Sequence, residues 1–176
     1  MDDALQILLD KQACVELVYR FARGLDRCDE AIVRSVFHAD GTDDHGQFKG
    51  TVDEFVAWVF PVLATMERTQ HVIGNVLVEV DGDRAWAESY FVAYHDLVNA
   101  YGGSLRTTVA GRYLDRFERR GGEWRISHRK FVSDWSASDA RSDMWDREAP
   151  GPRIFGRRDR DDPLYAEMAR TQKVTA

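Results

Sequence analysis

Cysteine and long apolar runs are scarce in this sequence of 176 residues. The two cysteines, Cys14 and Cys28, fall in one predicted helix, too far apart for a disulfide, which needs Cα atoms within about 7 Å. Their spacing is not that of a zinc site either. No apolar run approaches the roughly 20 residues of a membrane span, and the N-terminus lacks the pattern of a signal peptide. We therefore expect a soluble cytoplasmic protein without a membrane partner.

An excess of basic residues is also missing. With 24 Lys and Arg against 30 Asp and Glu, the formal net charge is -6 at pH 7, whereas nucleic-acid-binding domains carry a basic face. Two arginine-rich stretches, Arg116–Arg129 and Arg153–Arg160, are interleaved with acidic or apolar residues, so we interpret both as solvated or interface surface. No nucleic-acid partner is predicted.

The motifs of metal, nucleotide and serine-hydrolase sites are absent as well. The five histidines show no HxH, HxxxH or HExxH spacing. The glycines form neither GxGxxG nor GxxxxGK[ST], and there is no GxSxG elbow. We expect no metal, no organic cofactor and no activated serine.

The patterns that are present favour helices first and strands afterwards. Apolar residues at three- and four-residue spacing predict an amphipathic helix over residues 10–28, and two further helices are expected. Alternating apolar residues then predict antiparallel strands joined by turns at 81–83 and 121–122. The two further helices are expected at 29–37 and 52–66, and Pro61 is expected to kink or end the second of them. A turn with short flanking strands is expected at 40–50, and the later strands at 69–80, 85–95, 105–119 and 123–135. This order indicates an α+β fold, a curved antiparallel or mixed sheet wrapped on the N-terminal helices.

The length suits one domain over residues 1–135, followed by an arm over residues 136–176. The arm is polar and contains three prolines, with one helical turn expected at 164–170. It nevertheless carries too many large apolar residues for a free tail: Met144, Trp145, Ile154, Phe155, Leu164 and Tyr165. We expect the arm to be ordered and to pack across a pocket mouth or on a neighbouring subunit.

Asp26 is unusual because it extends the apolar side of the first helix, one turn after Ala22. It also falls in the last turn, where the helix dipole disfavours a negative charge by roughly 0.3–1 kcal/mol. A buried functional carboxylate and a surface aspartate bonded to Arg23 or Arg27 both fit this position.

His71 opens a strand that is otherwise apolar. A histidine exchanges its proton near neutral pH, so a carboxylate partner would make it a usable base, but a satisfied core or edge residue fits the pattern too. His95 and His128 also fall on predicted strands, and the sequence leaves their direction open.

Arg129 has two interpretations. In a regular strand it shares a half-apolar face with Phe131, Ser133 and Trp135, where a guanidinium could bind a developing anion. It could instead form an ion pair with Asp115 or Asp134. Strand alternation also separates the face of Tyr113, Asp115 and Phe117 from that of Arg112, Leu114 and Arg116.

These segments together resemble the SnoaL-like branch of the NTF2-like superfamily. The resemblance runs from about Gln12 to Trp135 and is carried by a helix ending in Leu25–Asp26, by HVIGN at a strand start, and by GRYLDRF and WRISHR. Enzyme members of this branch include scytalone dehydratase, a bile-acid dehydratase and hexachlorocyclohexane dehydrochlorinase. The resemblance implies a cone-shaped fold that is an α+β barrel, a catalytic dyad of Asp26 and His71, and a pocket arginine at Arg129. Leu25 stands where scytalone dehydratase has a tyrosine, so the dyad carries over but the substrate does not.

The resemblance implies a cofactor-independent lyase in which His71 is a general base. The alternatives are a proton-shift isomerase like ketosteroid isomerase, and a non-catalytic binding or assembly subunit. A small hydrophobic cyclic or aromatic substrate is expected in an apolar pocket. Its expected contacts are Tyr19, Phe21, Trp58, Tyr90, Tyr94, Arg129, Ser133 and Trp135. A homodimer or homotrimer is expected through the sheet, with Val76, Val78, Tyr113 and Phe117 supplying apolar area.

Overall fold

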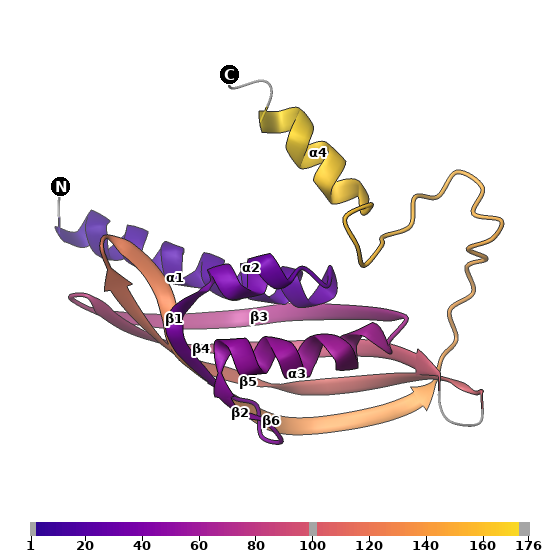
Figure 1. Ribbon diagram of the computed structural model, residues 1–176, viewed down its shortest axis with the longest axis horizontal. Coiled ribbons are helices and arrows are strands. Elements are labelled where there is room, and N and C mark those ends of the chain that lie inside the picture. Colours follow the sequence, from indigo (N-terminus) through magenta and orange to yellow (C-terminus); the bar gives the residue numbers. More distant parts are fainter. Residues whose placement is uncertain (1–2, 99–101, 173–176) are drawn as a thin grey trace.

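Three helices lie on one face of a long, curved sheet, and the arm returns above them from the end of the last strand (Figure 1). This arrangement comes from a computed structural model that describes residues 3–98 and 102–172. The helices on the sheet are α1 (Asp3–Asp26), α2 (Glu30–Ser35) and α3 (Val52–Ala64). The predicted α+β class is confirmed.

Helix α1 follows the predicted apolar stripe. Cys14, Val18 and Phe21 are completely buried against the sheet. The helix ends at Asp26, so the last residue of its buried face is a carboxylate. Helix α3 begins with a capping box, in which Thr51 and Glu54 each accept a hydrogen bond from the other's main-chain N–H. Pro61 lies inside α3 and does not end it, since the helix continues to Ala64.

The sheet has six strands among the described residues, in the order β2-β1-β6-β5-β4-β3. Strands β1 and β6 are parallel and all other neighbours are antiparallel. The strands are β1 (Phe37–Asp44), β2 (Lys49–Thr51), β3 (Arg68–Asp81), β4 (Arg84–Val98), β5 (Ser104–Arg120) and β6 (Glu123–Ala140). Two expectations need correction. Residues 40–44 belong to a strand rather than a turn, and the sheet is open rather than a barrel, with β2 and β3 at its edges.

Strand alternation holds for β5, where Tyr113, Asp115 and Phe117 are buried beneath the helices. It fails near the end of β6, where a bulge places Ser133 opposite Gly111 and Trp135 opposite Ala110. Because Gly111 and Ala110 face opposite sides of the sheet, Ser133 and Trp135 do too. The expectation that Trp135 shares the face of Arg129 is therefore wrong.

Arg129 lies in the core and forms an ion pair with Asp115. Its Nε and Nη2 donate to the two carboxylate oxygens at 2.7 and 2.6 Å, and both side chains are fully buried. The guanidinium is 3.9 Å from the ring centroid of Phe21 and 4.2 Å from that of Tyr113. Of the two interpretations of Arg129, the structure shows the ion pair, with Asp115 as the partner.

The arm begins five residues later than expected, because β6 runs to Ala140. It then crosses the open end of the sheet and ends in α4 (Pro163–Gln172), which is longer than the predicted turn (Figure 1). Its anchors on the helices include a hydrogen bond of 2.9 Å from the Tyr165 hydroxyl to Asp29. The last four residues of the arm lie outside the described residues. None of the described helices is long and apolar enough to cross a membrane.

The residues expected to supply an apolar outer sheet face are placed differently. Val78, Tyr113 and Phe117 are buried in the core, because their positions in the pleat face the helices, and Val76 is partly buried beside them. The large apolar residues that the sheet does expose include Val72, Leu77, Trp86, Tyr90 and Trp135.

Self-association through the sheet stays a prediction, and these exposed side chains are now the ones that would support it. We expect light scattering at micromolar concentration to give a mass at least twice the 20.2 kDa of the chain. A Leu77→Lys substitution on the exposed sheet face should shift the mass toward the monomer. A particle of one chain mass for the unaltered protein would refute the prediction.

Replacing Arg129 by methionine should destabilise the fold strongly, because it leaves the Asp115 carboxylate buried without a counterion. The expected loss of unfolding free energy is about 3–5 kcal/mol, measured by urea denaturation. The double variant Arg129→Met with Asp115→Leu should recover part of this loss. Arg112→Met on the opposite face of β5 is the matched control, since its partners Glu88 and Asp134 are partly solvated. An equal loss of unfolding free energy in Arg129→Met and Arg112→Met would show that burial of the Asp115 carboxylate is not the cause.

Candidate active site

Asp26 and His71 meet where the end of α1 crosses the edge strand β3. The His71 main-chain N–H donates to Asp26 Oδ2 at 2.8 Å, and His71 Nδ1 lies 2.8 Å from Asp26 Oδ1. The imidazole side chain is 6% exposed and the carboxylate 11%. One carboxylate therefore fixes both the backbone and the ring of the histidine.

The charge of Asp26 sets the tautomer of this histidine. Burial by itself would raise the pKa of the Asp26 carboxyl, but the hydrogen bonds and the charge of His71 outweigh it and hold this pKa below its usual range. An ionised carboxylate only accepts hydrogen bonds, so Nδ1 is the donor. In the neutral imidazole Nε2 then carries the lone pair, and Nε2 has no hydrogen-bond partner among the described residues.

His95 is the second histidine of the site. The rings of His71 and His95 are perpendicular, with centroids 5.6 Å apart. The β3–β4 register pairs His71 with Ala93 and Thr69 with His95, so both histidines face the helices. Burial, and next the charge of His71, lower the pKa of His95 to about 4. His95 is thus a neutral neighbour at physiological pH.

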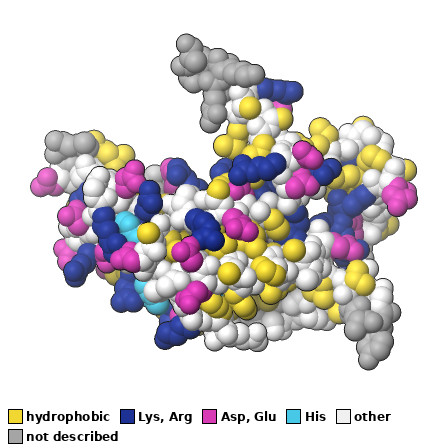
Figure 2. Space-filling model, in the orientation of Figure 1, with side chains coloured by type: hydrophobic (Ala, Val, Ile, Leu, Met, Phe, Trp, Pro, Cys, Tyr) yellow, Lys and Arg dark blue, Asp and Glu magenta, His cyan; other side chains and the backbone are white. Residues whose placement is uncertain are grey.

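A cavity of about 650 Å³ lies beside the pair, between the end of α1, the strand ends and the arm. Six arginines line it together with Asp26, Asp96 and Asp143. The expectation of an apolar pocket is wrong here, because the arm and the strand ends contribute mainly charged side chains. Figure 2 shows Lys and Arg side chains gathered where the arm meets the body of the protein. The interpretation of 153–160 as solvated or interface surface also fails for Arg158, which is half-buried, whereas Arg157 lines the cavity with a side chain that is 54% exposed.

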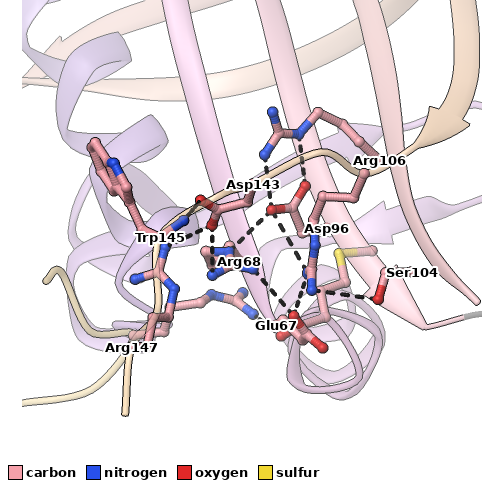
Figure 3. Close-up of polar contacts among 11 residues, drawn as sticks. Glu67, Arg68, Asp96, Ser104, Arg106, Asp143, Trp145 and Arg147 are labelled. Atoms are coloured by element: carbon pink, nitrogen blue, oxygen red, sulfur yellow. Dashed lines mark hydrogen bonds and ion pairs between the residues drawn. The ribbon is translucent and has the colours of Figure 1, made fainter. Parts of the chain in front are cut away.

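Asp96 holds one side of the cavity together. Arg106 Nε and Nη2 donate to its two oxygens at 2.7 and 2.9 Å, and Arg68 Nε donates to Oδ2 at 3.0 Å (Figure 3). Burial would raise the pKa of Asp96, but these two arginines lower it. Arg68 also pairs with Asp143 of the arm at 3.3 Å, which fastens the start of the arm to the end of the sheet.

The other candidate contact residues divide into three groups. Tyr94 lines the 650 Å³ cavity, and Tyr19 lines a second hollow of about 420 Å³ on the far side of Asp26 and His71. Phe21 and Arg129 lie in the core, and Trp58, in the middle of α3, stacks on Phe48. The remaining three, all exposed and none among the described lining of either hollow, are Tyr90, Ser133 and Trp135.

Sequence patterns missed His95 and Arg158 for different reasons. His95 is two residues from the partner of His71, but the strand register that brings them together is not readable from one sequence. Arg158 reaches the cavity only because the arm folds back. No group of three or more His, Cys, Asp or Glu in the described parts of the chain is placed to hold a metal ion.

Comparisons with known proteins agree with this architecture. The model of the SnoaL-like domain matches residues 6–130. No curated protein matches the chain in sequence.

Three solved structures illustrate the fold. A hexachlorocyclohexane dehydrochlorinase from Novosphingobium barchaimii is 21% identical, with a TM-score of 0.69 over 78% of this chain and 95% of its own. A candidate scytalone dehydratase from Novosphingobium aromaticivorans is 17% identical, with a TM-score of 0.65 over 74% of this chain and 87% of its own. A Mycobacterium tuberculosis protein of unknown function is 19% identical, with a TM-score of 0.65 over 98% of this chain and 92% of its own.

At these identities the structures show a shared fold alone, and the family rests on the domain match, which spans more than half of the chain. The helices in a curved sheet, the match over residues 6–130 and the neighbouring folds therefore lead to one conclusion: this chain belongs to the SnoaL-like domain family, with the NTF2-like cone fold.

Proposed function

We propose that this protein is a cofactor-independent lyase in which His71 removes a proton from a small cyclic or aromatic substrate. The observation that carries the proposal is the double hydrogen bond between His71 and Asp26 at the wall of a cavity. The fold neighbours support a reaction of this kind, since they include a dehydrochlorinase and a candidate dehydratase.

In the proposed reaction Asp26 orients the imidazole and stabilises the imidazolium that forms. The Nε2 lone pair takes a proton from a carbon next to the leaving group, and the electron pair of that C–H bond forms the new double bond. The leaving group departs with the electrons of its own bond. Positioned general-base catalysis of this type contributes roughly 10²- to 10⁴-fold.

The walls of the cavity suit a small molecule with both apolar and polar parts. Phe155 of the arm supplies an apolar surface to the cavity, and the buried ring of Phe91 packs near the base, with its centroid 6.3 Å from that of His71. Tyr94, Thr69 and Gln70 line the same cavity and can bind polar substituents. A volume of about 650 Å³ lies within the range of about 300–1,000 Å³ usual for small-molecule sites.

The His71→Ala variant should lose activity by about 10²- to 10⁴-fold, since the base is removed. Asp26→Asn should also lose activity, because a neutral amide cannot stabilise the imidazolium. The assay uses a panel of cyclic β-hydroxy and β-chloro ketones, with the new double bond followed by absorbance and proton exchange from D₂O followed by NMR.

His128→Ala is the matched control, because His128 is also a strand histidine bonded to a side chain, Thr42 Oγ1 at 2.8 Å, but lines a different hollow. It should keep full activity. Exchange without loss of the leaving group would favour a proton-shift isomerase instead. Equal behaviour of the unaltered protein and His71→Ala across the panel would overturn the proposal in favour of a binding subunit.

His95 should stay neutral through the working pH range, because its pKa is lowered to about 4. A neutral neighbour leaves His71 free to become positive during the reaction. In an NMR titration from pH 8 to pH 3.5, we expect the His95 ring signals to move only below about pH 5. A titration of the His95 ring signals between pH 6 and 7 would contradict the lowered pKa of His95.

A further inference from the structure

Arg158 is hydrogen-bonded on one side of its guanidinium and unpartnered on the other in the described residues. Its Nη1 donates to the main-chain oxygens of Leu63 and Met66, at 2.8 and 2.5 Å, where α3 ends. The free carbonyls of a helix C-terminus attract a cation, so these two bonds fix the position of the guanidinium. From there the side chain lines the same cavity as Asp26 and His71.

The opposite edge of this guanidinium is buried without a partner. Nε and Nη2 of Arg158 are shielded from solvent, and neither has a hydrogen bond in the described residues. Buried N–H groups in folded proteins are almost always paired, since an unpaired one has given up its hydrogen bonds to water without replacing them. Among the cavity arginines, Arg158 alone lacks a carboxylate partner in the described part of the chain, whereas the other five form ion pairs: Arg27, Arg68, Arg106, Arg147 and Arg157.

The unpartnered edge of Arg158 has the donor pattern that binds carboxylates elsewhere in this protein. Arg129 uses Nε and Nη2 to hold both oxygens of Asp115 at 2.7 and 2.6 Å. Arg106 uses the same two atoms to hold both oxygens of Asp96 at 2.7 and 2.9 Å. These parallel bonds are the geometry in which a guanidinium recognises a carboxylate.

The charge balance around Arg158 also favours an anion. Burial lowers the pKa of the Arg158 guanidinium from its usual value, and the charge of Asp26 only partly counteracts this. A carboxylate on the unpartnered edge would offset the cost of keeping a cation out of water.

We infer that the substrate carries a carboxylate, which Arg158 holds through Nε and Nη2 in the cavity that contains His71. This inference rests on the proposed function, whose substrate class it narrows. The arm thereby supplies the residue that determines specificity, whereas the domain supplies the proposed base.

Benzoate and its neutral counterpart benzamide test the inference without any turnover. In calorimetric titrations at pH 7 we expect the unaltered protein to bind benzoate at least about tenfold more tightly than benzamide. Arg158→Gln should abolish this preference. Arg157→Gln is the matched control, since Arg157 lines the same cavity but already pairs with Asp159, and it should keep the preference.

A loss in Arg158→Gln could also follow from release of the arm, so two further variants separate the causes. Asp143→Asn removes the ion pair to Arg68 at the start of the arm and leaves Arg158 intact, and limited proteolysis reports whether either variant frees the arm. The inference predicts that Asp143→Asn keeps the preference for benzoate and that Arg158→Lys restores it in part. If Asp143→Asn also loses it, or if Arg158→Gln keeps it, the inference is overturned.

His71→Ala separates this inference from the proposed function. Because the preference belongs to Arg158, the variant should still bind benzoate more tightly than benzamide even though its activity is lost. A preference that disappears in His71→Ala and persists in Arg158→Gln would place the anion on the histidine and refute the inference. An Arg158-dependent preference in a protein that shows no His71-dependent activity would refute the proposed function alone.

Discussion

The carboxylate of Asp26 connects helix α1, the edge of the sheet and the proposed active site. In the described part of the chain, strand β3 is at the edge of the sheet and has only β4 as a strand neighbour. Asp26 accepts the main-chain N–H of His71 on the open side of that strand and also bonds to its ring. The end of α1 is thereby tied to the sheet by the same contact that orients the proposed base. This is why a charged residue continues the apolar stripe of the helix.

Charge pairing also explains where the cavity lies. In the core, Arg129 and Asp115 neutralise each other among the rings of Phe21 and Tyr113. Arg129 Nη1 has no hydrogen bond in the described residues, but Arg129 lines neither hollow beside His71. At the open end of the sheet the pairing is incomplete, because Arg158 is bonded within the described residues only to carbonyl oxygens. The same kind of residue is thus structural in one place and available for a ligand in the other.

Much of the fold could be predicted because local patterns agreed with it. The apolar stripe of α1 and the alternation of β5 led to the correct class, and the family resemblance selected Asp26 and His71 as a pair. The prediction for Trp135 failed because a bulge interrupts the alternation of side chains along β6. The bulge opposite Ala110 and Gly111 turned Trp135 to the other face. The bulge depends on the pairing of β6 with β5, which a single segment does not contain.

The sequence by itself determined the order of helices and strands, the burial of the α1 stripe and the presence of a carboxylate at its end, because these follow from the spacing of side chains along one element. Only the tertiary structure decided that His95 lies against His71, because the β3–β4 register brings residues 24 positions apart onto one face. It also decided that the arm lines the cavity with Arg158. That contact joins residues about 90 positions apart, and it depends on the path of the chain after β6, which no local periodicity encodes.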